Sequence, residues 1–223
     1  KVEGVAPCAT REVITTSTTG DCVVACATDD RVSTRSACNG IVSGTGRDIV
    51  CTGRRNNRIG TISAGQPLAK NEFIYWQGEV ADFELNAEFR LSGNLSANSG
   101  IQFRSQRFPD GHAAGYQADM DQGDLWLGRI YDEHGRALLV ERGAHVAIAP
   151  DGRRWTEKFG EPASYRTLPK PPGEWNTYRI IASGPHLEVW INGQRVAVLD
   201  DHQSDAARYA GVLALQLHSG AGP

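Results

Sequence analysis

The sequence from residue 83 to residue 91 reads FELNAEFRL. Apolar residues occupy every second position, and acids, an amide and a base fill the positions between them. A period of two places alternate side chains on opposite faces of a β-strand. The stretch therefore predicts a strand with one face in a hydrophobic core and the other face in water.

The same alternation recurs along the rest of the chain. Further strands are predicted at residues 101–104, 116–121, 187–191, 195–199 and 213–218. The pair Asn192-Gly193 favours a type I′ turn, so the two strands that flank it should form a hairpin. Short strands separated by turns, with no convincing helix, indicate an all-β sandwich or barrel.

Composition limits the classes of function. The 223 residues are 40% hydrophobic and 22% charged, which is enough to build a core. The net charge of -3 argues against a nucleic-acid-binding protein, which normally carries a basic surface. No run of about 18 apolar residues is present, so no transmembrane segment is expected. The sequence also lacks the motifs of serine hydrolases, zinc proteases, P-loop proteins and dinucleotide-binding proteins.

All five cysteines lie in the first 51 residues, at Cys8, Cys22, Cys26, Cys38 and Cys51. Clustered cysteines in Thr-, Ser- and Gly-rich sequence suggest disulfide bonds and hence an extracytoplasmic protein. A metal knuckle is the alternative, although the spacings lack the paired C-x2-C pattern of zinc sites. The composition changes near residue 60. We therefore predict a Cys-containing segment of unassigned fold at residues 1–60 and a β domain at residues 61–223.

Three of the predicted strands carry unusual polar residues opposite their apolar residues. These are Gln102 and Arg104, then Gln117, Asp119 and Asp121, then Gln216 and His218. Amides, carboxylates, a guanidinium and an imidazole can together hydrogen-bond several sugar hydroxyls. If the three strands are neighbours, these side chains converge on one carbohydrate site. The alternative is a solvated face whose residues are ordinary cross-strand partners.

The run from Asp119 to Asp124 carries oxygen ligands at spacings that a calcium loop uses. It departs from the EF-hand pattern, because the twelfth position is Ile130 instead of Glu. A divalent cation, calcium or similar, held by Asp119 and Asp121 is therefore one interpretation. A solvated acidic turn is the other.

Two further features suggest contact with a sugar. The run YDEHGR at residues 131–136 places five functional side chains around one glycine, although a charged hairpin turn would look the same. Trp190 occupies a polar position of its strand, which makes it a candidate for stacking on a sugar ring. The other tryptophans in the β domain are as readily explained as core or structural residues.

Five motifs occur in order between residues 98 and 218. They are NSGIQFRS at 98–105, GYQAD at 115–119, YDEHGR at 131–136, WNTY at 175–178 and LQLH at 215–218. Together they resemble the 3-keto-disaccharide hydrolase (3-keto-glycoside hydrolase) domain family. The resemblance implies an antiparallel β-sandwich of the concanavalin A-like jelly-roll type. It also implies a bacterial protein that is periplasmic, secreted or held at the cell surface.

The activity that the resemblance implies is cleavage of 3-keto-glycosides. A ketone at C3 acidifies the proton at C2, so the glycosidic bond can break by elimination, followed by addition of water. This chemistry needs a base near C2, a donor for the developing enolate and an acid for the leaving oxygen.

On this chain, chemistry assigns the predicted residues to these roles. Asp119 is expected to act as base or metal ligand, Arg104 as the enolate clamp, and Glu133 or His218 as the acid. The predicted substrate-binding residues are Gln102, Gln117, Tyr131, Arg136, Trp190 and Gln216.

A hypothesis from another class is that the domain is non-catalytic. It would then be a carbohydrate-binding module, or an accessory subunit of a larger extracytoplasmic or membrane-associated complex that meets protein partners through residues 1–60. Fold alone does not imply activity. Turnover by the isolated chain favours the enzyme, and glycan binding without turnover favours the module.

Overall fold

The computed structural model describes residues 68–91, 97–122 and 125–219, except for the side chain of Gln77. It also describes the backbone of short strands within residues 12–64. The side chains of the five cysteines fall outside these residues, as does the Gly123-Asp124 pair. The predicted disulfide bonds and the domain boundary at residue 60 therefore stay predictions.

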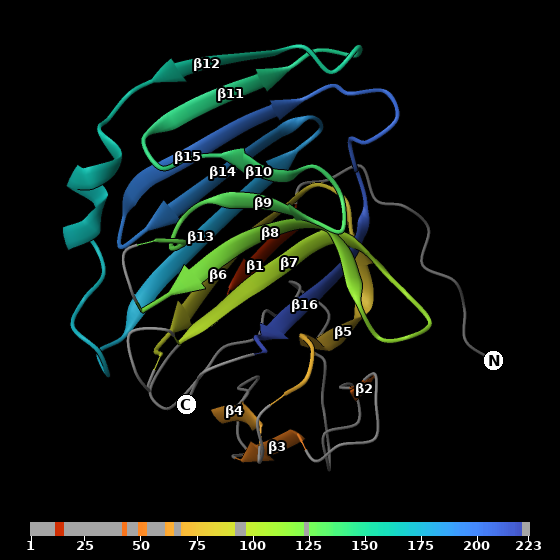
Figure 1. Cartoon of the computed structure of the whole chain (residues 1–223), viewed down its shortest axis with the longest axis vertical. Helices are drawn as coiled ribbons and strands as arrows, with labels where there is room; N and C mark the ends of the chain where they lie inside the picture. Colours follow the sequence, from red (N-terminus) through yellow and green to blue (C-terminus); the bar gives the residue numbers. More distant parts are fainter. Residues whose placement is uncertain are drawn as a thin grey trace.

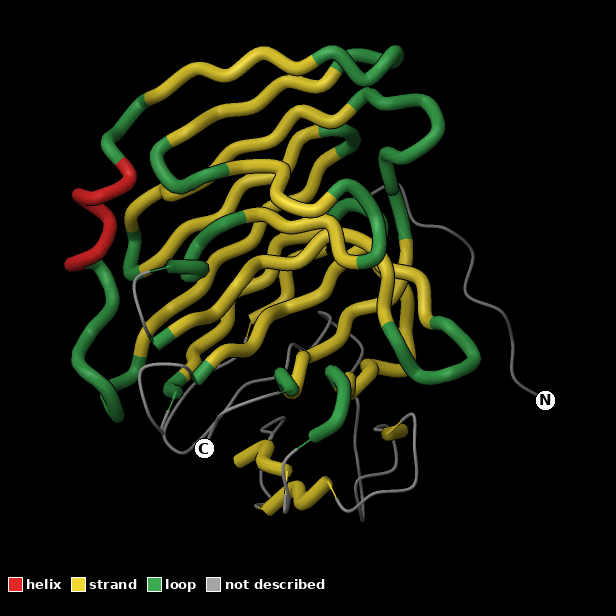
Figure 2. Tube along the Cα trace, viewed as in Figure 1, coloured by secondary structure: helices red, strands yellow, loops and turns green. Residues whose placement is uncertain are grey.

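The regular secondary structure of the described residues is almost all β-strand (Figures 1 and 2). The strands are β1 Glu12–Thr15, β2 Val42–Ser43, β3 Ile49–Thr52, β4 Thr61–Ala64, β5 Glu72–Val80, β6 Phe83–Phe89, β7 Asn98–Arg107, β8 Ala113–Asp121, β9 Ile130–Glu133, β10 Ala137–Val140, β11 Ala144–Ile148, β12 Arg154–Lys158, β13 Asn176–Ser183, β14 His186–Ile191, β15 Gln194–Asp201 and β16 Gly211–Leu217. The one helix among the described residues is a short 3-10 helix at Pro162–Thr167. No described helix is long and apolar enough to cross a membrane.

The strands form two sheets of seven strands, with β3 and β4 as a separate pair. Sheet A has the order β1-β6-β13-β14-β15-β11-β12, and sheet B has the order β10-β9-β8-β7-β16-β5-β2. All neighbours within the two sheets are antiparallel except β1 with β6 and β11 with β15. The predicted all-β sandwich of jelly-roll type is confirmed. The predicted hairpin is present as well, since Asn192 and Gly193 both have the positive φ of a type I′ turn.

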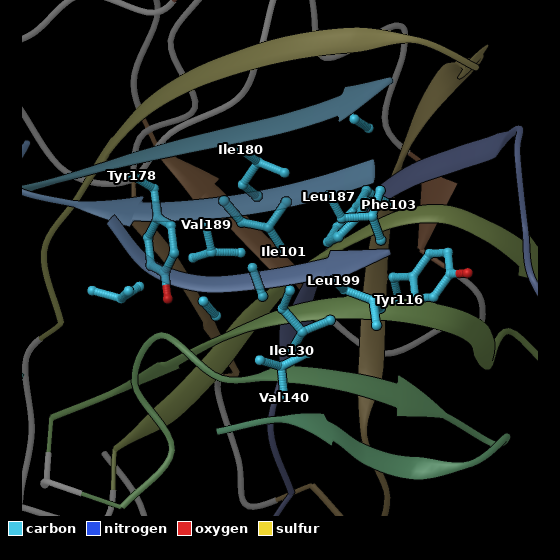
Figure 3. Packing of buried hydrophobic residues seen from close by; sticks show 14 of the residues in the cluster. Ile101, Phe103, Tyr116, Ile130, Val140, Tyr178, Ile180, Leu187, Val189 and Leu199 are labelled. Atoms are coloured by element: carbon cyan, nitrogen blue, oxygen red, sulfur yellow. The ribbon is translucent and has the colours of Figure 1, made fainter. Parts of the chain in front are cut away.

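The core lies between the two sheets and is built from the alternating apolar residues. In β6 the burial alternates strictly, with every odd-numbered residue from Phe83 to Phe89 buried. Phe83 of sheet A meets Phe103 of sheet B edge-on at 6.0 Å, and Phe103 stacks on Tyr116 at 5.7 Å. Figure 3 shows Phe103, Tyr116 and other side chains filling the space between the sheets. Burial of one such large side chain stabilises a fold by about 1.5–3 kcal/mol.

Sheet B makes neighbours of the three strands that carry the polar residues. β7 pairs with β8 on one side and with β16 on the other. Gln102 lies opposite Gln117, and Gln117 lies opposite Tyr131 of β9. Two residues away along the same pair of strands, Gly100 lies opposite Asp119. The condition for a common site, that these strands be adjacent, is therefore met.

A bulge in β7 separates Arg104 from that site. The register with β8 shifts between Phe103 and Gln106, and Arg104 has a φ of 47°. A bulge reverses the face on which the next side chain lies. The expectation that Arg104 shares a face with Gln102 is therefore wrong.

Arg104 instead ties the ends of the two sheets together. Its guanidinium donates to the carbonyl oxygens of Ala81 at 2.7 Å and Gly184 at 2.6 Å, and to Asp82 Oδ1 at 2.9 Å. Only 1% of the residue is exposed. A buried arginine with these partners is a structural cross-link.

We predict that Arg104→Met destabilises the fold by about 2–4 kcal/mol, because buried carbonyl oxygens lose their donor and the ion pair with Asp82 is removed. Urea unfolding measures the effect. Arg153→Met is the matched control, because Arg153 is 72% exposed and pairs with an exposed aspartate. Equal midpoints for wild type and Arg104→Met would contradict the structural role.

Candidate functional site

Sheet B directs four polar side chains away from the sandwich core, here called the polar face: Gln102, Gln117, Asp119 and Gln216. Their exposed fractions are 0% for Gln102, 3% for Gln117 and Gln216, and 4% for Asp119. A solvated strand face would leave such residues exposed. Because burial of polar groups costs free energy unless they are hydrogen-bonded, their bonding partners decide what the face can do.

A chain of hydrogen bonds runs along the polar face and ends on Asp119. The Ser105 hydroxyl donates to Gln102 Oε1 at 2.7 Å, and Gln102 Nε2 donates to Gln117 Oε1 at 2.8 Å. Gln117 Nε2 then donates to Asp119 Oδ1 at 2.7 Å. All the donors point the same way along the chain, so each bond polarises the next. The chain fixes the orientation of both amides and of the carboxylate.

Two glycines make room for this chain. A Cβ atom on Gly100 would lie 2.5 Å from Gln117 Cδ, and a Cβ atom on Gly115 would lie 2.7 Å from Ser105 Oγ. Gly115 also has a φ of 142°, which side chains rarely adopt. The missing side chains on one strand therefore leave the space that the polar side chains of the next strand occupy.

The carboxylate of Asp119 is only half satisfied. Oδ2 is buried without a hydrogen-bond partner among the described residues, and so is Oε1 of Gln216. Burial, opposed by the bond from Gln117 and reinforced by the charge of Glu133, raises the pKa of Asp119 from 3.8 to about 7. Asp119 therefore changes charge near neutral pH, where a general base is most effective.

The backbone of Asp119 is held from both sides. Its carbonyl oxygen accepts the N–H of Gly128 at 3.0 Å and the hydroxyl of Tyr178, and its N–H donates to the carbonyl of Arg129 at 3.2 Å. Tyr178 belongs to β13 of sheet A and crosses the core, where Figure 3 shows its hydroxyl among the packed side chains. The position of the carboxylate is therefore fixed by the packing of the two sheets.

The polar face is bordered on the β9 side by Tyr131 and Glu133. The Glu133 side chain is 16% exposed, and its charge acts on Asp119. Tyr131 packs edge-on against Trp126 at 6.1 Å. Burial, and then the charges of Glu133 and Asp119, raise the pKa of Tyr131, so its hydroxyl stays protonated and available as a donor.

A family model described as the 3-keto-alpha-glucoside-1,2-lyase-like domain matches residues 41–222. The chain belongs to this family. The match covers the polar face and both sheets except β1, so the predicted family is confirmed.

Solved structures that are similar to this chain come from carbohydrate-related proteins. The carbohydrate-binding module CBM66 from Bacillus subtilis shares 15% identity over 81% of this chain and 88% of that chain, with a TM-score of 0.50. A putative glycosyl hydrolase from Parabacteroides distasonis shares 19% identity over 69% and 79% of the two chains, with a TM-score of 0.45. At these identities the likeness shows the fold alone. None of the curated proteins matches this chain.

Within this family member, Arg136 lies apart from the polar face. Its guanidinium donates to Asp132 Oδ2 at 2.6 Å and to Asp201 Oδ2 at 2.7 Å, and Tyr116 also donates to Asp201. The cluster joins the β9–β10 turn of sheet B to the end of β15 in sheet A. Arg136 is therefore fully used in holding the two sheets together.

Of two other predicted site residues, Trp190 lies on sheet A and His218 lies at the end of a strand of sheet B. Trp190 lies on β14 of sheet A, where it donates to Glu188 at 2.7 Å and lies under the guanidinium of Arg179 at 5.5 Å. It is not brought to the polar face. His218 is exposed and follows β16, two positions after Gln216.

The second acid of the predicted metal pair has another use. Asp121 Oδ2 accepts the backbone N–H groups of Leu125 at 3.1 Å and Trp126 at 2.8 Å, so it closes the loop after β8. Among the described residues, no group of three or more histidines, cysteines or acids is arranged to hold a metal ion. A cation on Asp119 and Asp121 stays a prediction.

We predict that the stability of the wild type falls between about pH 4 and pH 7. The folded state keeps a proton on Asp119 that the unfolded chain has already lost, so unfolding is favoured as pH rises through this range. A shift of about three pKa units corresponds to about 4 kcal/mol. Asp119→Asn should remove this part of the dependence and be the more stable protein at pH 8. Parallel pH profiles of unfolding free energy for the two proteins would contradict the raised pKa.

We also predict that Gly100→Ala raises the pKa of Asp119 further. The new methyl group displaces the amide of Gln117, and the carboxylate loses the hydrogen bond that favours its ionised form. Carbon-13 NMR titration of the Asp119 carboxyl group measures the shift. Gln117→Ala should give a similar shift, and the double variant should add little, because all three act through one bond. Additive shifts would argue against this route.

Proposed function

We propose that this chain cleaves 3-keto-glycosides by elimination across C1 and C2 of the keto sugar, with Asp119 as the base. The observation that carries the proposal is the buried carboxylate of Asp119, which has one bonded oxygen, one unpartnered oxygen and a pKa of about 7. Membership of the family and the β-sandwich support it. The hydrogen-bond chain holds the unpartnered oxygen in one orientation, as proton abstraction requires.

The steps balance with the residues at the polar face. Asp119 Oδ2 takes the proton from C2, and the electron pair is delocalised onto the C3 ketone oxygen, where the Tyr131 hydroxyl donates a hydrogen bond. The C1–C2 double bond then forms as the C1–O1 bond breaks, and O1 of the leaving group takes a proton from a water molecule that the Glu133 carboxylate holds. The hydroxide left from that water adds at C1, and Asp119 returns its proton to C2.

The amides supply recognition. The Gln216 carbonyl Oε1 is buried without a described partner, so it can accept a hydrogen bond from a sugar hydroxyl. A sugar hydroxyl that donates to it would repay the cost of its burial. Arg104, Arg136 and Trp190 have no part in the proposed steps.

The test is turnover of a 4-nitrophenyl 3-keto-glucoside, followed by release of the nitrophenol. We expect kcat/KM to rise with pH through about 7, as the base Asp119 becomes ionised. Asp119→Asn should lose about 10²–10⁴-fold in kcat. Asp205→Asn, an exposed acid on the loop after β15, is the control and should keep full activity.

Two results would reject the enzyme. One is wild-type activity in Asp119→Asn, which would remove the base. The other is binding of the keto sugar by the wild type with no release of nitrophenol under any pH, which would favour the non-catalytic carbohydrate-binding alternative. An extracytoplasmic location, which the five cysteines predict, is tested separately by fractionation of cells that produce the full-length protein.

A further inference from the structure

The tip of the β7–β8 hairpin, residues 107–112, folds back over the first residues of β5 (Figure 1). The Tyr75 hydroxyl donates to the carbonyl of Gly111 at 3.0 Å, and the Arg107 guanidinium lies 4.7 Å from the centre of the Tyr75 ring. Lys70 donates to the carbonyl of Asp110 at 3.1 Å. The hairpin is therefore pinned to β5, the strand that lies beyond β16 at the side of the polar face.

This fold-back brings together two histidines from separate turns. His134 Nε2 lies 3.1 Å from His112 Nδ1, and the two rings meet edge-on at 5.0 Å. His112 also contacts the ring of Phe73 at 6.3 Å, and His134 contacts the ring of Phe108 at 6.0 Å. The His134 side chain remains 43% exposed. The pair is thus packed on its inner side and open on its outer side.

The facing nitrogens share one hydrogen bond, and this fixes what the pair offers to a ligand. If His134 Nε2 donates, then His134 Nδ1 is left as an acceptor and His112 Nε2 as a donor. If His112 Nδ1 donates, the two outer nitrogens exchange these roles. In either arrangement the neutral pair presents one donor and one acceptor, which matches two neighbouring hydroxyl groups.

The order of groups along β8 and β9 indicates which part of a substrate reaches the pair. Gln117 lies opposite Tyr131, and Asp119 lies two residues further along β8. Glu133 lies opposite Gly115, which is two residues from Gln117 in the other direction. His134 follows Glu133, and its Nε2 lies 4.0 Å from Glu133 Oε1. Under the proposed function Asp119 acts at C2 and Glu133 at O1, so whatever lies past Glu133 belongs to the leaving group.

We infer that His112 and His134 form a subsite for the leaving group, which binds a pair of neighbouring hydroxyls such as those of a second sugar. The inference rests on the proposed function for its direction. The ring of Phe108 flanks the pair and provides an apolar surface for the carbon atoms of the same sugar.

His112→Phe is the decisive variant. It keeps a ring against Phe73 and removes both nitrogens, and it leaves the positive φ of His134 untouched. For a 3-keto-disaccharide we expect KM to rise about 3–10-fold with kcat unchanged, the cost of one or two hydrogen bonds. For methyl 3-keto-glucoside, whose leaving group has no ring, both constants should stay at their wild-type values. His112→Gln, which restores a donor and an acceptor, should recover part of the loss, and His202→Ala is the exposed-histidine control.

Three results would overturn the subsite: no change with the disaccharide, an equal change with both substrates, or loss of the disaccharide preference when the wild type is treated with EDTA, which would make the pair a metal site. Failure of the proposed function is recognised separately. If the wild type turns over neither substrate, calorimetric Kd values for the same two sugars decide the matter. The subsite then requires tighter binding of the disaccharide by the wild type and equal Kd values in His112→Phe.

Discussion

The arrangement of the polar face depends on one constraint, the burial of a carboxylate that has only one hydrogen-bonded oxygen. Burial of Asp119 disfavours its charge, and the bond from Gln117 lowers that cost without cancelling it. Gln117 can make this bond only because Gln102 and Ser105 occupy its other end and hold the amide in one orientation. The chemistry proposed for the site therefore depends on a hydrogen bond that offsets only part of the cost of burying the Asp119 charge.

The neighbouring strands β7 and β8 of sheet B each carry a polar side chain and a glycine that leaves room for the polar side chain of the other strand. Gly100 of β7 accommodates Gln117 of β8, and Gly115 of β8 accommodates Ser105 of β7. Each strand thus supplies a polar group and a gap for its neighbour's group. The arrangement needs both strands in register, which the apolar residues Ile101 and Ala118 secure from the core side of the sheet.

The sequence alone predicts the sandwich, because alternation with a period of two depends only on which residues are apolar. It also predicts Gln102, Gln117, Asp119 and Gln216 as one set, since these obey the same alternation. It could not place Arg104, because a bulge changes the face of a residue without changing the pattern of residue types. Arg136 is predicted from the YDEHGR run and Trp190 from its polar position in a strand. Partners on sheet A, which the sequence does not reveal, determine where they lie. Gly100 and Gly115 each lie directly before a predicted strand, and the alternation of residue types does not indicate the close packing that the structure shows at these glycines.

The link between the core and the base limits how such a site can change. Tyr178 reaches from sheet A to the carbonyl of Asp119, and Gly128 donates to the same oxygen. A shift of sheet A relative to sheet B would therefore move the carboxylate, and with it the oxygen that the proposed chemistry uses. The pKa and position of Asp119 are consequently tied to the packing that keeps the two sheets together.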